Sequence, residues 1–201
     1  MKKIVFLFMI FQSMLQAYYY SPVLFPKNPN FLFGITTSYN TSSIEVMTSS
    51  TDYLIDGDIN LIYNDNILLG FDIGIKNDLL KTYISFDTST DLDYYRILFN
   101  YDIYLGPVNN KIKWLIGFSF GAETGNYEIL NSNLDYKNSL VGIKWGISVK
   151  GKHHSSYEFV ISYLYGINYY SESNEFSNGY DRLSFDTIDS NTFNFKIKYN
   201  F

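Results

Sequence analysis

The last ten residues, 192–201, alternate strictly between polar and apolar side chains. Because successive side chains of a β-strand point to opposite faces, this pattern predicts a strand with one apolar face and one polar face. A sheet made of such strands must cover its apolar face, and this requirement constrains the fold more than any other feature of the sequence. The apolar positions are Phe193, Phe195, Ile197, Tyr199 and Phe201.

The same period of two recurs in seven earlier segments, so that the chain is predicted to contain eight strands. Tyrosine and phenylalanine are abundant, at 20 and 17 residues, and both residues favour strands. Tyrosine also suits a membrane interface, where its ring needs one apolar and one hydrated end. The seven segments are 31–39, 53–63, 67–75, 93–105, 112–120, 141–149 and 157–169.

The connections between these segments fall into two alternating classes. Short turns are predicted at 64–66, 106–110 and 150–156. Long polar loops are predicted at 40–52, 77–92, 124–137 and 171–190. This asymmetry is typical of an all-β, eight-stranded antiparallel up-and-down transmembrane β-barrel with short periplasmic turns and four longer extracellular loops.

A soluble eight-stranded barrel such as a lipocalin is the alternative fold. Its polar strand faces would point outward and would be rich in Lys and Glu. The polar faces here are rich in Gly, Ser and Asn instead, which suit the narrow interior of a small barrel. The sequence therefore favours the membrane barrel.

The first 30 residues precede the predicted barrel. Residues 1–17 resemble a cleaved secretory signal peptide, with Lys2 and Lys3 before a short apolar run and Ala17 at the expected cleavage point. Residues 18–30 carry three prolines and are interpreted as an extended periplasmic lead-in. The barrel domain is predicted to occupy residues 31–201.

With this alternation and Phe201 as an aromatic terminal residue, the chain resembles the small eight-stranded bacterial outer-membrane barrels, which include the OmpX-like proteins and the transmembrane domain of OmpA. The resemblance implies location in the outer membrane of a Gram-negative cell, in contact with its lipid and lipopolysaccharide. It also implies that the closing strand, from Phe193 to Phe201, is the signal recognised by the outer-membrane assembly machinery.

Ten charged residues are predicted to face the barrel interior, five of each sign. An ion in a narrow lumen is costly without a partner, so these charges are expected to form a paired network that plugs the barrel. Arg96 is the best candidate for bidentate pairing with a carboxylate. The acids are Asp56, Asp58, Asp72, Asp102 and Glu158, and the bases are Arg96, Lys113, Lys144, Lys196 and Lys198.

The chain offers little catalytic chemistry. His154 and Ser156, with Glu158 close by, resemble the His and Ser pair of the outer-membrane lipid A deacylases. In that family an Asn usually follows the Ser on a strand at the outer leaflet, whereas Tyr157 follows here and the pair is expected in a periplasmic turn. A polar turn with hydrated His153 and His154 side chains is the alternative interpretation, so no catalytic residue is predicted.

No cofactor or metal site is predicted either. The chain has no cysteine, so thiolate ligands and disulfides are excluded. The acids of 171–190 do not follow the spacing of a calcium-binding loop. The formal net charge of -5 argues against a nucleic-acid partner.

Three function classes follow from the sequence. The first, which we favour, is a structural or surface-interaction barrel with a plugged lumen that displays four loops, since function tends to lie on loops held by rigid elements. The second is a narrow pore for small solutes, and the third is a lipid A-modifying enzyme. The loops do not identify an extracellular partner.

Overall fold

The computed structural model describes residues 29–50, 59–89, 94–107, 109–129, 132–152, 155–171, 176–177 and 182–201. Eight long strands and one two-residue strand make up a single sheet. The strands are β1 (Asn30–Ser50), β2 (Ile59–Lys76), β3 (Leu80–Ser89), β4 (Tyr95–Leu105), β5 (Ile112–Ile129), β6 (Ser132–Lys150), β7 (Ser156–Ser171), β8 (Phe176–Ser177) and β9 (Arg182–Asn200).

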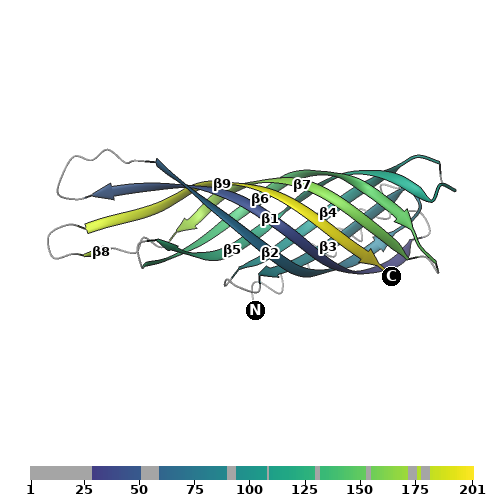
Figure 1. Cartoon of the computed structure of the whole chain (residues 1–201), viewed down its shortest axis with the longest axis horizontal. Helices are drawn as coiled ribbons and strands as arrows, with labels where there is room; N and C mark the ends of the chain where they lie inside the picture. Colours follow the sequence, from purple (N-terminus) through teal and green to yellow (C-terminus); the bar gives the residue numbers. More distant parts are fainter. Residues whose placement is uncertain are drawn as a thin grey trace, which may run out of the picture.

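The sheet closes into a barrel. Each long strand pairs antiparallel with the next in chain order, and β1 pairs with β9 from Gly34↔Asn200 to Ser50↔Leu183. The short strand β8 pairs with Arg182 and Leu183 at the start of β9. Figure 1 shows the strands tilted around a common long axis. The predicted fold, an eight-stranded antiparallel up-and-down barrel, is therefore confirmed.

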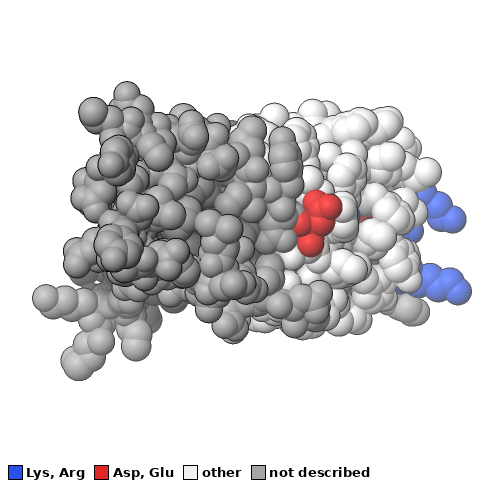
Figure 2. All heavy atoms as spheres, turned by 60° about the vertical axis from the view of Figure 1, so that its left-hand side comes forward, with Lys and Arg blue, Asp and Glu red and all other residues white. Residues whose placement is uncertain are grey.

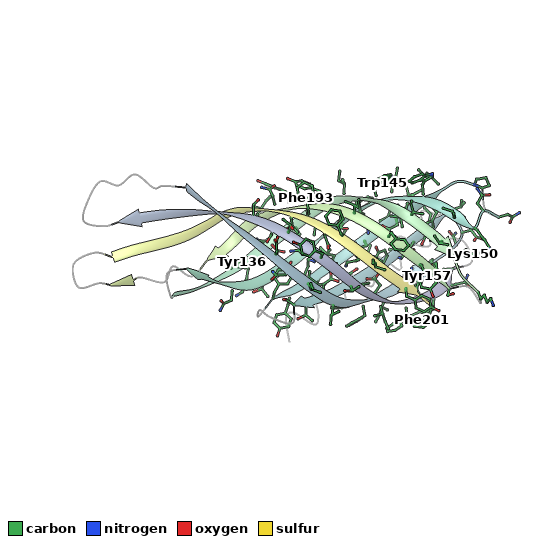
Figure 3. The ribbon with its side chains drawn as sticks, in the orientation of Figure 1. Tyr136, Trp145, Lys150, Tyr157, Phe193 and Phe201 are labelled. Carbon is green, nitrogen blue, oxygen red and sulfur yellow. The ribbon has the colours of Figure 1, made fainter. Side chains whose placement is uncertain are left out.

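The barrel has an apolar outside and a polar inside. On β9, Phe193, Phe195 and Ile197 are each about half exposed, whereas Lys196 and Lys198, which alternate with the outward-facing residues, are buried. Figure 3 shows Trp145 and Phe193 on the outer side of the wall. Figure 2 shows few charged side chains on the part of the outer wall that is not grey. In the described ranges, no helix has the length and apolarity that a membrane span requires.

The turn predicted at 64–66 is wrong. Strand β2 runs without interruption from Ile59 to Lys76 and pairs with β1 from Asn30↔Lys76 to Met47↔Ile59. Asn64, Asp65 and Asn66 favour turns in isolation. Here their backbone groups belong to the β1–β2 ladder, so long-range pairing overrides the local preference.

The loop predicted at 77–92 is also wrong, because it contains β3. Its alternation places Lys81, Tyr83 and Asp87 inside the barrel and leaves Ile84 and Phe86 more exposed. The many polar residues of this stretch are typical of a loop, but they line the barrel interior. The sequence predicted separate strands at 53–63 and 67–75, whereas residues 59–76 form one strand, and it missed β3. These two errors cancel, so the predicted number of eight strands is still correct.

The other predicted long loops are largely strand. Strand β1 continues to Ser50, β5 reaches Ile129, β6 begins at Ser132 and β9 begins at Arg182. Polar side chains in these segments therefore do not mark loops, because backbone pairing with neighbouring strands decides the structure. The turns predicted at 106–110 and 150–156 do connect β4 to β5 and β6 to β7, except that Lys150 already belongs to β6 and Ser156 to β7.

One end of the barrel gathers the short connections. Residues 77–79, 106–111 and 151–155 join successive strands there, and the up-and-down topology places Asn30 and Phe201 at the same end. We call it the terminal end, and the opposite one the loop end. The predicted signal peptide, residues 1–17, and nearly all of the lead-in lie outside the described residues.

Candidate functional site

The charged interior is the most distinctive feature of the barrel. Eight of the ten predicted interior charges lie in the described ranges, and all eight side chains are buried. They are Asp72, Arg96, Asp102, Lys113, Lys144, Glu158, Lys196 and Lys198. The other two, Asp56 and Asp58, lie outside the described residues.

One cluster is built around Asp87 on β3. Arg96 from β4 donates from Nε and Nη2 to Asp87 Oδ2, at 3.1 and 2.9 Å. Lys196 from β9 lies 2.8 and 2.9 Å from the two carboxylate oxygens. Thr36 on β1 donates to Oδ1 at 3.3 Å, and Arg96 Nη1 donates to Asn40 Oδ1 at 3.2 Å. This cluster ties together four strands on different sides of the barrel.

A second cluster surrounds Tyr83, whose side chain is buried in the lumen. Lys198 and Lys144 donate to Tyr83 Oη at 2.6 and 2.8 Å. The same two lysines pair with Asp72 and Asp102, at 2.8 and 2.6 Å. Their Nζ atoms lie 4.2 and 4.6 Å from the centre of the Tyr83 ring, within the range of a cation–π interaction.

Two further carboxylates are held on either side of these clusters. Glu158 on β7 accepts hydrogen bonds from Lys81 Nζ at 2.7 Å and from Tyr104 Oη at 2.6 Å. Glu123 on β5 accepts from Tyr94 Oη at 2.6 Å and from Asn138 Nδ2 at 3.0 Å. Each acid of the described interior is thus held by a cation or by neutral donors.

Sequence reasoning missed three charged residues of this network and the tyrosine at the centre of the second cluster. Lys81, Tyr83 and Asp87 lie on β3, which was predicted as a loop, and Glu123 lies beyond the predicted end of its strand. The signal for the first three was present: they alternate with Thr82, Ile84 and Phe86. The weak apolar character of that alternation concealed it.

The described interior contains nearly equal numbers of acids and bases. The buried acids are Asp72, Asp87, Asp102, Glu123 and Glu158, and the buried bases are Lys81, Arg96, Lys113, Lys144, Lys196 and Lys198. Lys113 lies closest to an acid at the terminal end, 3.8 Å from the exposed side chain of Asp78. Without Lys113, five acids face five bases, so the interior charges compensate one another.

The described residues do not assemble a metal site. No group of three metal-binding side chains occurs among them. His153 and His154 lie outside the described residues, so the lipid A deacylase-like interpretation of His154 and Ser156 stays a hypothesis. Ser156 Oγ accepts a hydrogen bond from Asn200 Nδ2 at 3.2 Å, and the Glu158 carboxylate is held by Lys81 and Tyr104.

The predicted assembly signal lies on the outer wall. The ring of Phe201 lies 4.7 Å from that of Tyr199 and 5.9 Å from that of Phe33. The backbone N–H of Phe201 donates to Phe33 O at 2.8 Å. These contacts join the end of β9 to β1 across the closure of the barrel.

A comparison with solved structures identifies the class of fold. The crystal structure of Neisserial surface protein A (NspA) matches with a TM-score of 0.50 and 8% identity, over 84% of this chain and 95% of that chain. The chain has the fold of the small eight-stranded outer-membrane β-barrels. No protein-family model matches the chain, and no curated protein matches its sequence.

Two other solved structures also match. The N-terminal β-barrel domain of Pseudomonas aeruginosa OprF has a TM-score of 0.49 and 10% identity, over 82% of this chain and 97% of that domain. Ail, the attachment invasion locus protein of Yersinia pestis, has a TM-score of 0.35 and 12% identity, over 86% of this chain and 99% of that one.

Proposed function

We propose that the protein is a bacterial outer-membrane barrel with a sealed lumen, and that it serves as a rigid scaffold presenting its loop end at the cell surface. The apolar outer wall supports the membrane location, because large exposed side chains such as Trp114, Trp145 and Phe118 are stable in contact with lipid. Outer-membrane phospholipid and lipopolysaccharide would cover this wall.

The sealed lumen is supported by one observation above all, the burial and pairing of the interior charges. The side chains of Lys81 and Glu158 are fully buried, and those of Arg96 and Asp87 are at most 1% exposed. An eight-stranded barrel has an interior just wide enough for side chains to fill it. Long side chains that meet across such an interior leave little room for a continuous water path.

The proposed orientation places the terminal end in the periplasm and the loop end outside the cell. This arrangement follows the usual rule for outer-membrane barrels, whose short turns are periplasmic. The assembly machinery would recognise β9 from the periplasmic side. A partner of the protein would then meet the loop end.

Site-directed labelling of intact cells tests this orientation. The chain contains no cysteine, so a single introduced cysteine gives a signal without background. We expect a membrane-impermeant maleimide to label a Ser173→Cys variant, between β7 and β9, and to spare a Lys152→Cys variant in the turn between β6 and β7. Both variants should be labelled after the cells are lysed. Labelling of Lys152→Cys alone in intact cells would reverse the orientation.

A further inference from the structure

The terminal end of the barrel contains a cavity of about 500 Å³. It lies at the mouth of the lumen, among the short turns and the adjoining ends of the strands. Its basic lining residues are Lys76, Lys111, Lys113 and Lys150. Figure 3 shows Lys150 at this end of the barrel, and Figure 2 shows basic side chains projecting from it. We call this space the vestibule.

The vestibule is strongly positive. Four lysines line it against one carboxylate, that of Asp78, which gives four minus one, or a net charge of +3. The rest of its lining is neutral and mostly polar, and includes Asn110 and Ser155. The vestibule therefore differs from the deeper lumen, where acids and bases compensate one another.

Asp78 does not neutralise this charge. Its Oδ1 lies 3.8 Å from Lys113 Nζ and 3.9 Å from Lys150 Nζ, and its side chain is 57% exposed. Such long and hydrated ion pairs contribute little. The interior acid Glu158 is paired with Lys81 and hydrogen-bonded to Tyr104, itself a lining residue, and it also attracts the Lys76 ammonium. The uncompensated charge of the vestibule is therefore carried mainly by Lys111, Lys113 and Lys150.

We infer that the vestibule binds a phosphate-bearing anion. Several ammonium groups around one space suit a compact multivalent anion, and lysine is a common phosphate ligand. Neutral amides and hydroxyls add donors for the remaining oxygens. The volume lies within the range of small-molecule sites, so it accommodates more than a bare phosphate group.

Two sources supply this chemistry, a soluble phosphate compound or the headgroup of an anionic phospholipid. Under the proposed function the vestibule faces the periplasm and the inner leaflet, where both occur. That placement rests on the proposed orientation, whereas the cavity and its charge do not. Binding is therefore measured on purified protein in a phosphate-free maltoside detergent, where membrane orientation has no influence.

The first experiment measures the affinity for inorganic pyrophosphate by titration calorimetry. We expect Lys150→Glu and Lys111→Glu to weaken binding about fivefold or more each, since each replaces an attraction by a repulsion. Asp78→Asn should tighten binding, because it removes the vestibule's one carboxylate. The matched controls are Lys152→Glu, in the turn that follows Lys150 but outside the lining, and Asp65→Asn, exposed on β2. Both controls should bind like the wild type.

The second experiment identifies the source by native mass spectrometry with added phosphatidylglycerol. The site is assigned to a lipid headgroup if the lipid is retained most by Asp78→Asn, less by the wild type and the controls, and least by Lys150→Glu and Lys111→Glu, while pyrophosphate does not bind. Pyrophosphate binding in that order assigns it to a soluble phosphate compound. The inference is overturned if neither probe binds, or if Lys152→Glu weakens binding as much as Lys150→Glu. Heat-modifiable gel migration verifies that every variant is folded.

Discussion

At the scale of single residues, the barrel interior depends on carboxylates shared between cations. The Asp87 carboxylate forms ion pairs with both Arg96 and Lys196. These two residues come from β4 and β9, which lie on either side of the β1–β9 closure. A pair of this kind contributes little net stability, because both ions lose their water. Removing one partner is costly, however, since the other stays buried without full compensation.

Arg96→Ala should therefore destabilise the barrel by about 3–5 kcal/mol. The measurement is urea-induced unfolding of protein in lipid vesicles, followed by the fluorescence of Trp114 and Trp145 on the outer wall. Lys152→Ala, at an exposed position of the turn between β6 and β7, is the control and should change the free energy of unfolding by less than about 0.5 kcal/mol. Equal stabilities for the two variants would show that Arg96 is hydrated rather than buried.

Tyr83→Phe tests the second cluster. It keeps the ring beneath the lysines but removes the oxygen that accepts from Lys144 and Lys198. We expect a loss of about 1–3 kcal/mol, the cost of buried donors left without a partner, measured in the same assay. Tyr157→Phe makes the same chemical change on the exposed wall and should have almost no effect. A loss of similar size at Tyr157 would contradict this account.

At the scale of strands, the sequence predicted β4 and β7 closely because their outward faces are continuously apolar, whereas for β5, β6 and β9 it predicted only the part with such a face. Strands β1, β2 and β3 were harder to predict for a physical reason. Their polar stretches, such as Asn64–Asn66, form strands because neighbouring strands satisfy their backbone groups. Such pairing depends on residues far along the chain, and local periodicity does not report it.

Residues of the interior network were predicted where their strand was predicted, and were missed where it was not. Arg96, Lys144 and Lys198 follow directly from the alternation of β4, β6 and β9. Their partners do not, because Asp87 and Tyr83 lie on β3. The pairing itself also depends on the side chains that meet across the lumen, and a one-dimensional pattern does not contain that geometry.

The closing strand β9 carries a prediction of its own. Phe201 contributes one backbone hydrogen bond and ring contacts on the exposed wall, so its removal should change barrel stability only slightly. Deletion of Phe201 should nevertheless reduce insertion into the outer membrane, if its aromatic side chain acts in assembly. Surface abundance and heat-modifiable migration measure insertion in cells, and unfolding in vesicles measures stability. Unchanged surface abundance would contradict an assembly role.

At the scale of the whole molecule, charge is arranged along the barrel axis. The wall is apolar, the deep lumen holds compensated ion pairs, and the vestibule at the terminal end has an excess of lysines. This arrangement supports a barrel that presents surfaces at its two ends rather than one that conducts. The vestibule borders the interior network through Tyr104, which lines the vestibule and donates a hydrogen bond to Glu158.

Single-channel recording in planar lipid bilayers tests the sealed lumen most directly. The interior pairs of Asp87, Asp102 and Glu158 fill the space that a conducting path would need, so the wild-type protein should insert without steady current. Arg96→Ala, which removes the largest of these side chains, should open small conductance events in the same membranes. Large and steady single-channel currents from the wild-type protein would contradict the account and favour a pore.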